Sequence, residues 1–523
     1  MPVKNIQIDI TNRPFENIAL ALSGGGYRAT AFHLGVLSYL NTVTFQGQPL
    51  LNNLRMLSTI SGGTITGVFY AYSLASTSIT TFDKFFKELY SFLQKDDLLK
   101  ESVRIFRYKD KLTFHKGRID NVITTFAAMY DEYLFKGETF SALYKYSEEH
   151  NIDFMFNATD IERSLPFRFQ TRGKFGNGKY KVEQIDFDKI KLSDIVAASS
   201  CFPGGFEPMF FPNDFLKQPS KPYPTIRLMD GGVIDNQGTG SILLGEKAIN
   251  ALGTILISDV SCELDIGDNI AKPKSKQGFF TSLSSNKLKY MFFGATLVCF
   301  IALFKFDSLF FYSLSLFAGT ICLLLGAIIQ IAQFLIRKPL NDVAKEIPPF
   351  YEFYTSLKHL KIGELIDLLS VRLSSVFHLN NIVFLTRMRG MNFNYIMDNP
   401  KYYYRSVINS IYELKEDDKK PIIEREQLKP YIDDANNMPT TLWFTKTQKE
   451  SDRPMLNSLI VAGQATVCYN LIQYITKVKS NKELYALLDD AYKTGLDDFE
   501  KDLTANFEAF KNKPEWLLKQ FLG

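Results

Sequence analysis

The sequence predicts an α/β domain with a largely parallel sheet, then a membrane-spanning helical hairpin, then a mostly helical region. Before residue 265, short apolar runs that end in glycine-rich turns alternate with helical stretches, which is the pattern of parallel strands joined by crossover helices. Residues 290–304 and 308–329 carry no charge, and such runs are typical of membrane spans. Beyond residue 340, amphipathic helical patterns predominate.

Composition limits the class of protein. At 523 residues, the chain exceeds the roughly 250–300 residues at which a single core stops growing, so we expect more than one structural unit. Apolar residues make up 46% and charged residues 22%, as in ordinary globular proteins. The net charge of +4 is small for this length and argues against nucleic acid as a partner.

The cysteines and the N-terminus indicate a reducing compartment. The five cysteines are scattered without CxxC spacing, so we expect reduced thiols and neither a disulfide framework nor a zinc site. Residues 1–20 lack the apolar segment of a secretory signal. We therefore expect the protein to begin in the cytosol.

The α/β domain is predicted over residues 1–270. Its expected strands are the short apolar runs at 17–23, 54–60, 154–160, 226–230 and 254–260. The first two end in glycine-rich turns, and each leads into a helical stretch, at 27–41 and 64–75. This alternation favours a sheet whose strands run mainly in one direction.

The two uncharged segments predict a transmembrane hairpin over residues 288–337. The second continues to Ile336, beyond the ~20 residues that a spanning helix requires. The first covers only about 22 Å against a hydrocarbon core of ~30 Å, so it crosses only if flanking lysines snorkel or the bilayer thins. A re-entrant first segment and a buried hairpin in a soluble core are the alternatives. Basic residues flank both outer ends, so both ends should be cytoplasmic.

Residues 341–523 are expected to be mostly helical. Amphipathic patterns lie near 352–376, 400–414, 454–478 and 483–509. If only the second uncharged segment crossed the membrane, this region would lie across the bilayer from the α/β domain and could not pack on it. If both segments cross, it can pack there, and the mixed apolar and polar run at 438–448 favours that arrangement.

Ser61 lies between an apolar strand and a helical stretch, within STISGGTIT. A serine on such a strand-to-helix turn has the setting of a nucleophile elbow. Gly62 and Gly63 would allow a strained backbone and a close approach of the neighbouring strand, and the Gly62 amide would face a developing oxyanion. Thr59 stands where the GxSxG pattern has its first glycine, so the match is incomplete. A small-residue turn that only opens a helix is the alternative.

A second glycine-rich turn, SGGGYR at residues 23–28, also joins a strand to a helix. The amides of Gly24, Gly25 and Gly26 are free to face an anion, and Arg28 could hold the loop or meet a phosphate. A nucleotide phosphate loop is the competing interpretation, but the GK[ST] and GxGxxG spacings are absent. An oxyanion hole supplied by a loop remote from the nucleophile fits better.

A third strand ends at Asp230, which is followed by Gly231 and Gly232. A carboxylate at this position could activate a serine hydroxyl directly; a turn or cap aspartate is the alternative. Asp235 and Asn236 lie on the same loop and are expected to brace it.

No histidine has a sequence setting that singles it out as a catalytic base. The first lies inside the helix after the glycine-rich turn, and the others lie in polar or helical surroundings without a turn signal; they are His33, His115, His150, His359 and His378. A Ser-Asp dyad is therefore favoured over a Ser-His-Asp triad.

Together these stretches resemble the patatin-like phospholipase family. GGGYR, SGG and DGG stand in the order found in that family. FNATDIERSLPFRF (156–169) and SDIVAASSCFPGGFEPM (193–209) resemble its central strand motif and its Ala-Ser-rich helix that leads to a proline. Five motifs in the right order are far more specific than any single one, and the resemblance covers about residues 15–260.

The resemblance implies a three-layer α/β/α sandwich that hydrolyses lipid acyl esters through a covalent acyl-enzyme, with neither metal nor cofactor. It implies Ser61 as the nucleophile and Asp230 as its dyad partner. The implied oxyanion donors lie on the glycine-rich turn and after the serine, at Gly24, Gly25, Gly26 and Gly62. The implied supporting residues are Arg28, Gly63, Gly231 and Gly232.

We therefore expect a membrane-anchored serine acyl hydrolase whose substrates are phospholipids or lysophospholipids. Its catalytic domain should face the cytoplasmic leaflet of a bacterial inner membrane; an organelle membrane of a eukaryote would fit the hairpin equally well. The alternatives are an esterase or neutral-lipid hydrolase of the same fold, a non-catalytic membrane scaffold and a ligand-gated sensor. The presence of Ser61, Asp230 and the glycine-rich turn together counts against a scaffold. The oligomeric state is left open.

Overall fold

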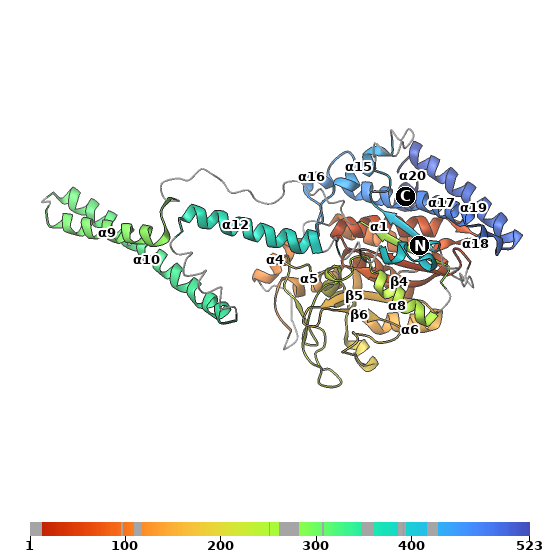
Figure 1. Cartoon of the computed structure of the whole chain (residues 1–523), viewed down its shortest axis with the longest axis horizontal. Helices are drawn as coiled ribbons and strands as arrows, with labels where there is room; N and C mark the ends of the chain where they lie inside the picture. Colours follow the sequence, from red (N-terminus) through yellow and green to blue (C-terminus); the bar gives the residue numbers. More distant parts are fainter. Residues whose placement is uncertain are drawn as a thin grey trace, which may run out of the picture. The chain divides into compact units, whose positions relative to one another are not determined.

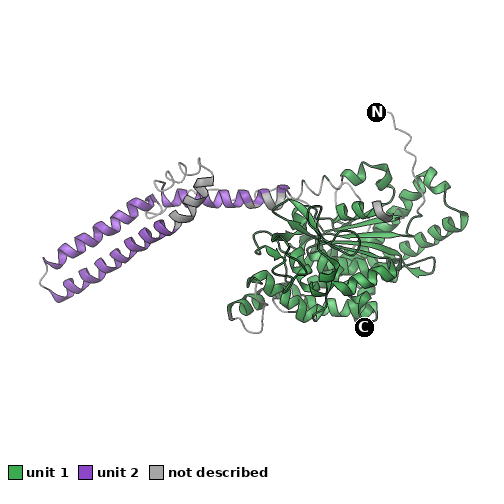
Figure 2. Ribbon diagram, turned by 90° about the horizontal axis from the view of Figure 1, so that it is seen from below, with its two compact units in different colours: residues 1–263, 385–523 green, residues 264–384 purple. Residues whose placement is uncertain are grey.

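The computed structural model describes residues 13–95, 98–108, 118–249, 252–260, 282–305, 308–346, 360–384, 387, 391, 394–415 and 427–523. The chain forms two units (Figure 2). The first consists of residues 1–263 and 385–523, and the second of residues 264–384. The C-terminal region therefore belongs to the same unit as the N-terminal half.

A mixed sheet of eight strands forms the centre of the first unit. Its order is β10-β9-β1-β4-β5-β8-β7, and β6 pairs with β5 off this path. The first five strands run parallel: β10 (Ser406–Ser410), β9 (Thr254–Asp259), β1 (Ile18–Leu22), β4 (Leu54–Ile60) and β5 (Asp153–Asp160). The antiparallel pairings at the other edge involve β8 (Ile226–Asp230), β7 (Met209–Phe211) and β6 (Leu165–Gln170). The sheet is thus mainly parallel, as the sequence predicts, and β1, β4, β5, β8 and β9 coincide with the five expected strands.

Helices cover both faces of this sheet (Figure 1). Because side chains alternate along a strand, Leu20 and Leu22 of β1 enter one apolar core and Ala19 enters another. The first core includes residues of α1 (Gly26–Thr42), α2 (Gly62–Ala75) and α17 (Met455–Ser480). The second includes Ile242 of α8 (Thr239–Ile249). This is the three-layer α/β/α arrangement.

The first core extends into most other helices of this unit. Its members come from α3 (Phe82–Gln94), α4 (Leu98–Tyr108), α5 (Val122–Tyr130), α6 (Phe140–His150), α7 (Leu192–Ser199), α15 (Lys429–Asn437), α18 (Lys482–Ala486), α19 (Asp490–Asn512) and α20 (Trp516–Leu522). The C-terminal helices therefore share one continuous core with the N-terminal half, which explains why they fold as one unit.

The α1–α17 crossing shows how closely the two halves pack. A Cβ placed on Gly35 of α1 would lie 2.1 Å from the Ile460 carbonyl oxygen, and one on Gly463 of α17 would lie 2.1 Å from the Phe32 carbonyl oxygen. Only glycine allows the two backbones to approach so closely. Although α17 is apolar and long enough to cross a membrane, 78% of its apolar window is buried within the protein.

One expected helix is wrong. Residues 400–414 form only a short helix, α14 (Pro400–Tyr403), before β10 begins at Ser406. Val407 and Ile408 of β10 pair with Leu256 and Ile257 of β9. β-Branched residues pack well in a sheet, and β9 would otherwise expose its open edge. Tertiary pairing therefore overrides the local helical pattern.

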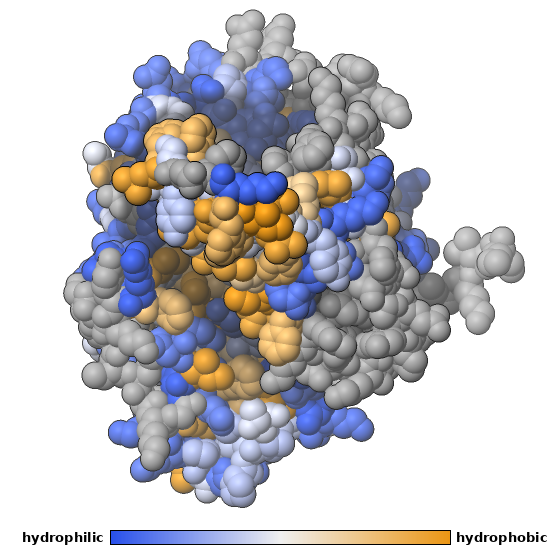
Figure 3. Space-filling model, turned by 90° about the vertical axis from the view of Figure 1, so that its left-hand side faces the viewer, coloured by the Kyte–Doolittle hydropathy of each residue, from blue (hydrophilic) through white to orange (hydrophobic). Residues whose placement is uncertain are grey.

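The second unit contains two long helices, α9 (Ser285–Leu303) and α10 (Leu309–Glu346), packed as a hairpin. Only 6% of the apolar stretch of α9 and 11% of the apolar stretch of α10 is buried within the protein. Figure 3 shows the left-hand side of Figure 1 face on, and hydrophobic side chains gather near the centre of that view. By length and composition both helices could cross a membrane. The unit ends with α12 (Ile362–His378) and a π-helical turn (Leu379–Phe384).

Candidate active site

Ser61 occupies the single residue between β4 and α2, in a backbone conformation that side chains rarely allow. Its φ of 50° and ψ of −119° lie outside the favoured regions for L-residues, at a cost of about 1–3 kcal/mol. The α2 backbone stabilises the turn, because the N–H groups of Thr64 and Ile65 donate to the Ser61 carbonyl oxygen. Such strain is typical of a nucleophile elbow.

Close packing explains the glycines after Ser61. A Cβ on Gly62 would lie 2.1 Å from the Gly26 carbonyl oxygen, and one on Gly63 would lie 2.5 Å from that of Leu22. The turn after the serine therefore rests directly on the glycine-rich turn. Thr59, which replaces the first glycine of the GxSxG pattern, is accommodated by Gly67 of α2. Gly67 leaves room for the Thr59 methyl group, because a Cβ on Gly67 would lie 2.3 Å from Thr59 Cγ2.

Ser199 of α7 holds the elbow from behind. Its hydroxyl accepts the Ser61 N–H at 3.0 Å and donates to the Asn157 carbonyl oxygen at 2.7 Å. The Thr64 hydroxyl lies 2.7 Å from the Ser199 hydroxyl oxygen. Ser199 and Asn157 belong to the two longer motifs quoted from the sequence, but their individual roles were not predicted, because they depend on contacts between distant segments.

The glycine-rich turn contains both available and occupied amides. Gly25 and Gly26 have φ values of 148° and 60°, which favour glycine. The Gly24 N–H donates to the Asn236 carbonyl oxygen at 3.0 Å, so this amide is already used. Within the described residues, the N–H groups of Gly25, Gly26 and Gly62 have no hydrogen-bond acceptor. These three amides are therefore available to an acceptor.

Sheet topology brings Asp230 to the level of Ser61. At the end of β4, Ile60 pairs with Asn157 of β5, and the next β5 residue, Ala158, pairs with Asp230. Ser61 and Asp230 are therefore separated by two strand spacings, about 10 Å between backbones. The antiparallel direction of β8 matters here, because it places the carboxyl end of that strand beside Ala158, two residues before the end of β5.

The Asn236 side chain lies between the two residues. A Cβ on Gly24 would lie 3.1 Å from Ser61 Cβ and 2.6 Å from Asn236 Oδ1; a Cβ on Gly232 would lie 2.5 Å from that oxygen and 3.0 Å from Asp230 Oδ1. Asp230 Oδ1 accepts the Gly232 N–H at 2.7 Å. Ser61, Asp230, the glycine-rich turn and the loop after β8 thus converge at one place. A Cβ on Gly231 would lie 2.4 Å from the Asn157 carbonyl oxygen.

Arg28 holds backbone segments together. Its guanidinium is buried and donates to the Met438 carbonyl oxygen at 2.9 Å and to that of Val260. Of the two roles considered from the sequence, these contacts match the one in which Arg28 holds the loop. They tie the helix after the glycine-rich turn to β9 and to the C-terminal region.

The C-terminal segment Met438–Phe444 lies directly on the glycine-rich turn. The Tyr27 N–H donates to the Thr441 carbonyl oxygen at 2.6 Å, and the rings of Tyr27 and Phe444 are 5.7 Å apart. A Cβ on Gly26 would lie 2.2 Å from the same carbonyl oxygen. Residues far downstream therefore fix the conformation of the turn.

His33 is a buried structural histidine. Its Nε2–H donates to the Ser23 carbonyl oxygen and its Nδ1 accepts from the Ser258 hydroxyl, both at 3.0 Å. Burial lowers the pKa of His33 to about 4, although the Ser23 hydrogen bond and the Asp259 charge act in the opposite direction. The chain of contacts continues through Asn409 of β10 to Asn470 of α17. His115 and His359 lie outside the described residues.

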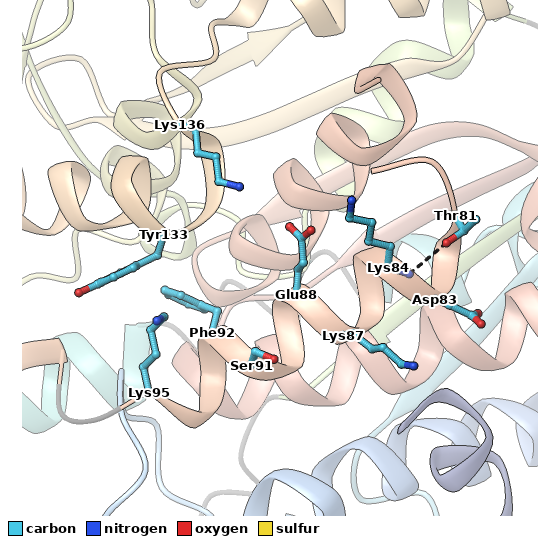
Figure 4. A pocket seen from close by; sticks show the side chains of 10 residues that line it. All are labelled: Thr81, Asp83, Lys84, Lys87, Glu88, Ser91, Phe92, Lys95, Tyr133 and Lys136. Carbon is cyan, nitrogen blue, oxygen red and sulfur yellow. Dashed lines mark hydrogen bonds between the residues drawn. The ribbon is translucent and has the colours of Figure 1, made fainter. Parts of the chain in front are cut away.

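Two surface cavities lie elsewhere on this unit. One of about 610 Å³ is lined mainly by α3 side chains, four of its ten lining residues being lysines (Figure 4). Its Phe92 ring lies 6.0 Å from that of Tyr27, next to the glycine-rich turn. The other, of about 440 Å³, lies around Arg118 and Lys189. Neither is lined by Ser61, which is 8% exposed.

The mainly parallel α/β sheet and the strained serine turn are those expected of the α/β class of serine hydrolases. Residues 20–241 match the family model described as patatin-like phospholipase, and this part of the chain is a patatin-like phospholipase domain, that of a lipid acyl hydrolase.

Solved structures that match include a human GIVD cytosolic phospholipase A2, with 13% sequence identity and a TM-score of 0.32. The match covers 46% of this chain and 42% of that chain, so this chain spans less than half of its length. A search of curated proteins found no match.

Proposed function

We propose that the protein is a membrane-anchored serine acyl hydrolase that cleaves fatty-acyl esters of phospholipids or lysophospholipids. The observation that carries this proposal is the strained Ser61 beside the unoccupied amides of Gly25, Gly26 and Gly62. Preorganised amides of this kind stabilise a developing oxyanion. Asp230 is the carboxylate that the sequence motifs imply as the dyad partner. It ends β8, which lies two strands away from β4, the strand that leads to Ser61.

In the proposed reaction, Asp230 accepts the Ser61 hydroxyl proton as Oγ attacks the ester carbonyl carbon. The amides of Gly25, Gly26 and Gly62 donate to the carbonyl oxygen as it becomes negative. The carbon–oxygen ester bond breaks, and the alcohol or lysolipid leaves with the proton that Asp230 had accepted. Water then attacks the acyl-serine with Asp230 as its base, and releases the fatty acid and the free Ser61 hydroxyl.

The connectivity of the sheet supports membrane anchoring through both hairpin helices. β9 precedes the second unit in the chain, β10 follows it, and the two strands are hydrogen-bonded neighbours. The chain must therefore return to the side of the membrane that it left. We propose that α9 and α10 both span, with the catalytic unit on the cytoplasmic side of an inner membrane, where basic residues flank the hairpin. Anchoring confines the site to its lipid substrate and raises the effective concentration.

The direct test is fatty-acid release from mixed phospholipid and lysophospholipid vesicles by the full-length protein. Ser61→Ala and Asp230→Asn should each lower release by about 10³-fold or more. The exposed residues Ser451 and Asp452 provide matched controls, because Ser451→Ala and Asp452→Asn change the same chemical groups far from the site and should keep full activity. Release that survives Ser61→Ala would overturn the assignment.

The same assay separates the alternative functions. Faster release from triacylglycerol emulsions than from phospholipid vesicles would identify a neutral-lipid hydrolase with the same dyad. No release from any ester by correctly folded protein would favour a scaffold or a gated enzyme.

A further inference from the structure

The helix α12 presents an apolar face that is exposed and that none of the described residues of its own unit covers. Ile366, Leu369, Leu373 and Val376 are 45–70% exposed, and their spacing of three, four and three residues places them on one side of the helix. Leu365 widens this stripe on the same side. The opposite side carries mainly polar residues, together with the partly buried Leu368 and Val371; the polar residues are Glu364, Asp367, Ser374, Ser375 and His378.

The first residue of α12 is fixed beside the first residue of the hairpin. The Ile362 N–H donates to the Leu283 carbonyl oxygen at 2.9 Å, and Ser284 and Lys361 form an antiparallel bridge. Ser284 is also the N-cap of α9, where its hydroxyl accepts the Lys287 N–H. The start of α12 and the start of α9 therefore lie at one level.

A polar cluster marks the end of the apolar part of the hairpin just above this level. Lys289, 9% exposed, donates to Gln330 Oε1 at 2.9 Å and to Gln333 Oε1 at 3.2 Å. Gln333 in turn donates to Ser285 Oγ and Asn286 Oδ1. At ~1.5 Å per residue, this cluster lies within roughly 10 Å of the Leu283 contact. If the hairpin spans a bilayer, α12 therefore begins at the membrane–water interface.

We infer that α12 is an interfacial helix that lies on the bilayer surface, with Ile366, Leu369, Leu373 and Val376 among the lipid headgroups and upper acyl chains. The inference rests on the membrane hairpin of the proposed function. An amphipathic helix buries its apolar face ~5–10 Å into this boundary. The lipid surface is favoured over a second copy of the chain, because α12 begins at the level where the exposed apolar surface of α9 and α10 ends. Leu365 also makes the stripe broader than a coiled-coil seam.

Depth-dependent fluorescence quenching tests this inference on the full-length protein in phospholipid nanodiscs. Single tryptophans are introduced as Leu373→Trp, on the apolar face, and Ser374→Trp, the adjacent residue on the polar face; the signal of wild type, which contains two tryptophans, is subtracted. Phe317→Trp, at a position that is 67% exposed on α10, reports on the hairpin itself. Brominated acyl chains quench from the lipid side and acrylamide from the water side.

We expect brominated lipids to quench Leu373→Trp at least about threefold more than Ser374→Trp, and acrylamide to show the reverse order. Quenching of both by acrylamide alone, with lipid quenching retained at Phe317→Trp, would overturn the interfacial helix while leaving the membrane hairpin intact. Shielding of Leu373→Trp from both quenchers would indicate a protein partner such as a second copy, and would also overturn it. Loss of lipid quenching at Phe317→Trp as well would overturn the hairpin assignment with it, and the vesicle assay would still decide the hydrolase.

Discussion

At the scale of single residues, the site depends on backbone positions where no side chain fits. Ser61 adopts a positive φ, and the glycines that follow it, Gly62 and Gly63, allow the serine turn to rest on the glycine-rich turn. The amide of Gly62 is both a proposed oxyanion donor and the point of closest approach, because a Cβ there would lie 2.1 Å from the Gly26 carbonyl oxygen. A small change at this residue should therefore have a large effect.

We expect Gly62→Ala to lower fatty-acid release by about 100-fold or more, because the added methyl must displace the glycine-rich turn and misalign the oxyanion donors. Its stability should fall by about 1–3 kcal/mol. Gly178→Ala is the matched control, since nothing lies within 4 Å of a Cβ at that position, and it should keep wild-type activity and stability. Equal activity of the two variants would contradict the assigned packing.

His33 makes the stability of the fold depend on pH. Burial lowers the pKa of its imidazole to about 4, whereas the pKa in the unfolded chain is about 6.5. Between these two values only the unfolded state binds the proton, so stability is complete above pH ~6.5 and falls as the pH drops toward ~4. The shift corresponds to about 3 kcal/mol.

His33→Gln removes this titration and keeps an amide that can bond to Ser23 and Ser258. We expect the free energy of unfolding of the variant to fall by about 3 kcal/mol less than that of wild type between pH 6.5 and pH 4. Urea denaturation of the detergent-solubilised protein at several pH values measures this difference. Parallel curves for the two proteins would show that His33 is not the titrating group.

At the scale of elements, the crossing of α1 and α17 joins the two halves of the first unit. Gly35 and Gly463 meet at this crossing, where each would direct a Cβ at a backbone carbonyl oxygen 2.1 Å away. The segment Met438–Phe444, which directly follows α15 and precedes α17 in the chain, contacts the glycine-rich turn that opens α1. The geometry of the site is thus coupled to the packing of a helix about 430 residues away in the chain.

Gly463→Ala should lower the free energy of unfolding by about 1–3 kcal/mol, because the helices must separate to admit the methyl group. Gly495→Ala in α19 provides the opposite control, since its Cβ would meet only Gln46 Cγ at 4.0 Å. Alanine in an open helical position should raise stability by about 0.5–1 kcal/mol. Thermal denaturation of wild type and the two variants measures the expected loss of stability in Gly463→Ala and the expected gain in Gly495→Ala. A neutral Gly463→Ala would show that the crossing is looser than described.

At the scale of the whole molecule, the pairing of β9 with β10 requires an even number of membrane crossings between them. Tags at the N-terminus and the C-terminus should therefore lie on the same side of a sealed vesicle, and a tag inserted after Lys305 should lie on the other. Protease accessibility before and after permeabilisation measures this. Termini found on opposite sides would mean that only one of α9 and α10 crosses.

The sequence alone determined the alternating strands and helices, the two uncharged helices and the order of the motifs. These features depend on local apolar periodicity and on short runs of glycine, which are readable without knowing what they contact. The five expected strands coincide with β1, β4, β5, β8 and β9 for the same reason, since each is an apolar run bounded by turn residues. The proposed nucleophile and its neighbouring glycines were likewise identified from the motif alone.

Only the tertiary structure decided the contacts between distant segments. The antiparallel direction of β8 brings Asp230 level with Ser61, the Asn236 carbonyl removes Gly24 from the free amides, and Ser199 and Thr441 hold the two turns. Residues 406–410 form a strand within the helix expected over 400–414, because the open edge of β9 offered hydrogen bonds that a local pattern cannot reveal. Backbone groups find their partners by proximity in space, and a sequence pattern records only proximity along the chain.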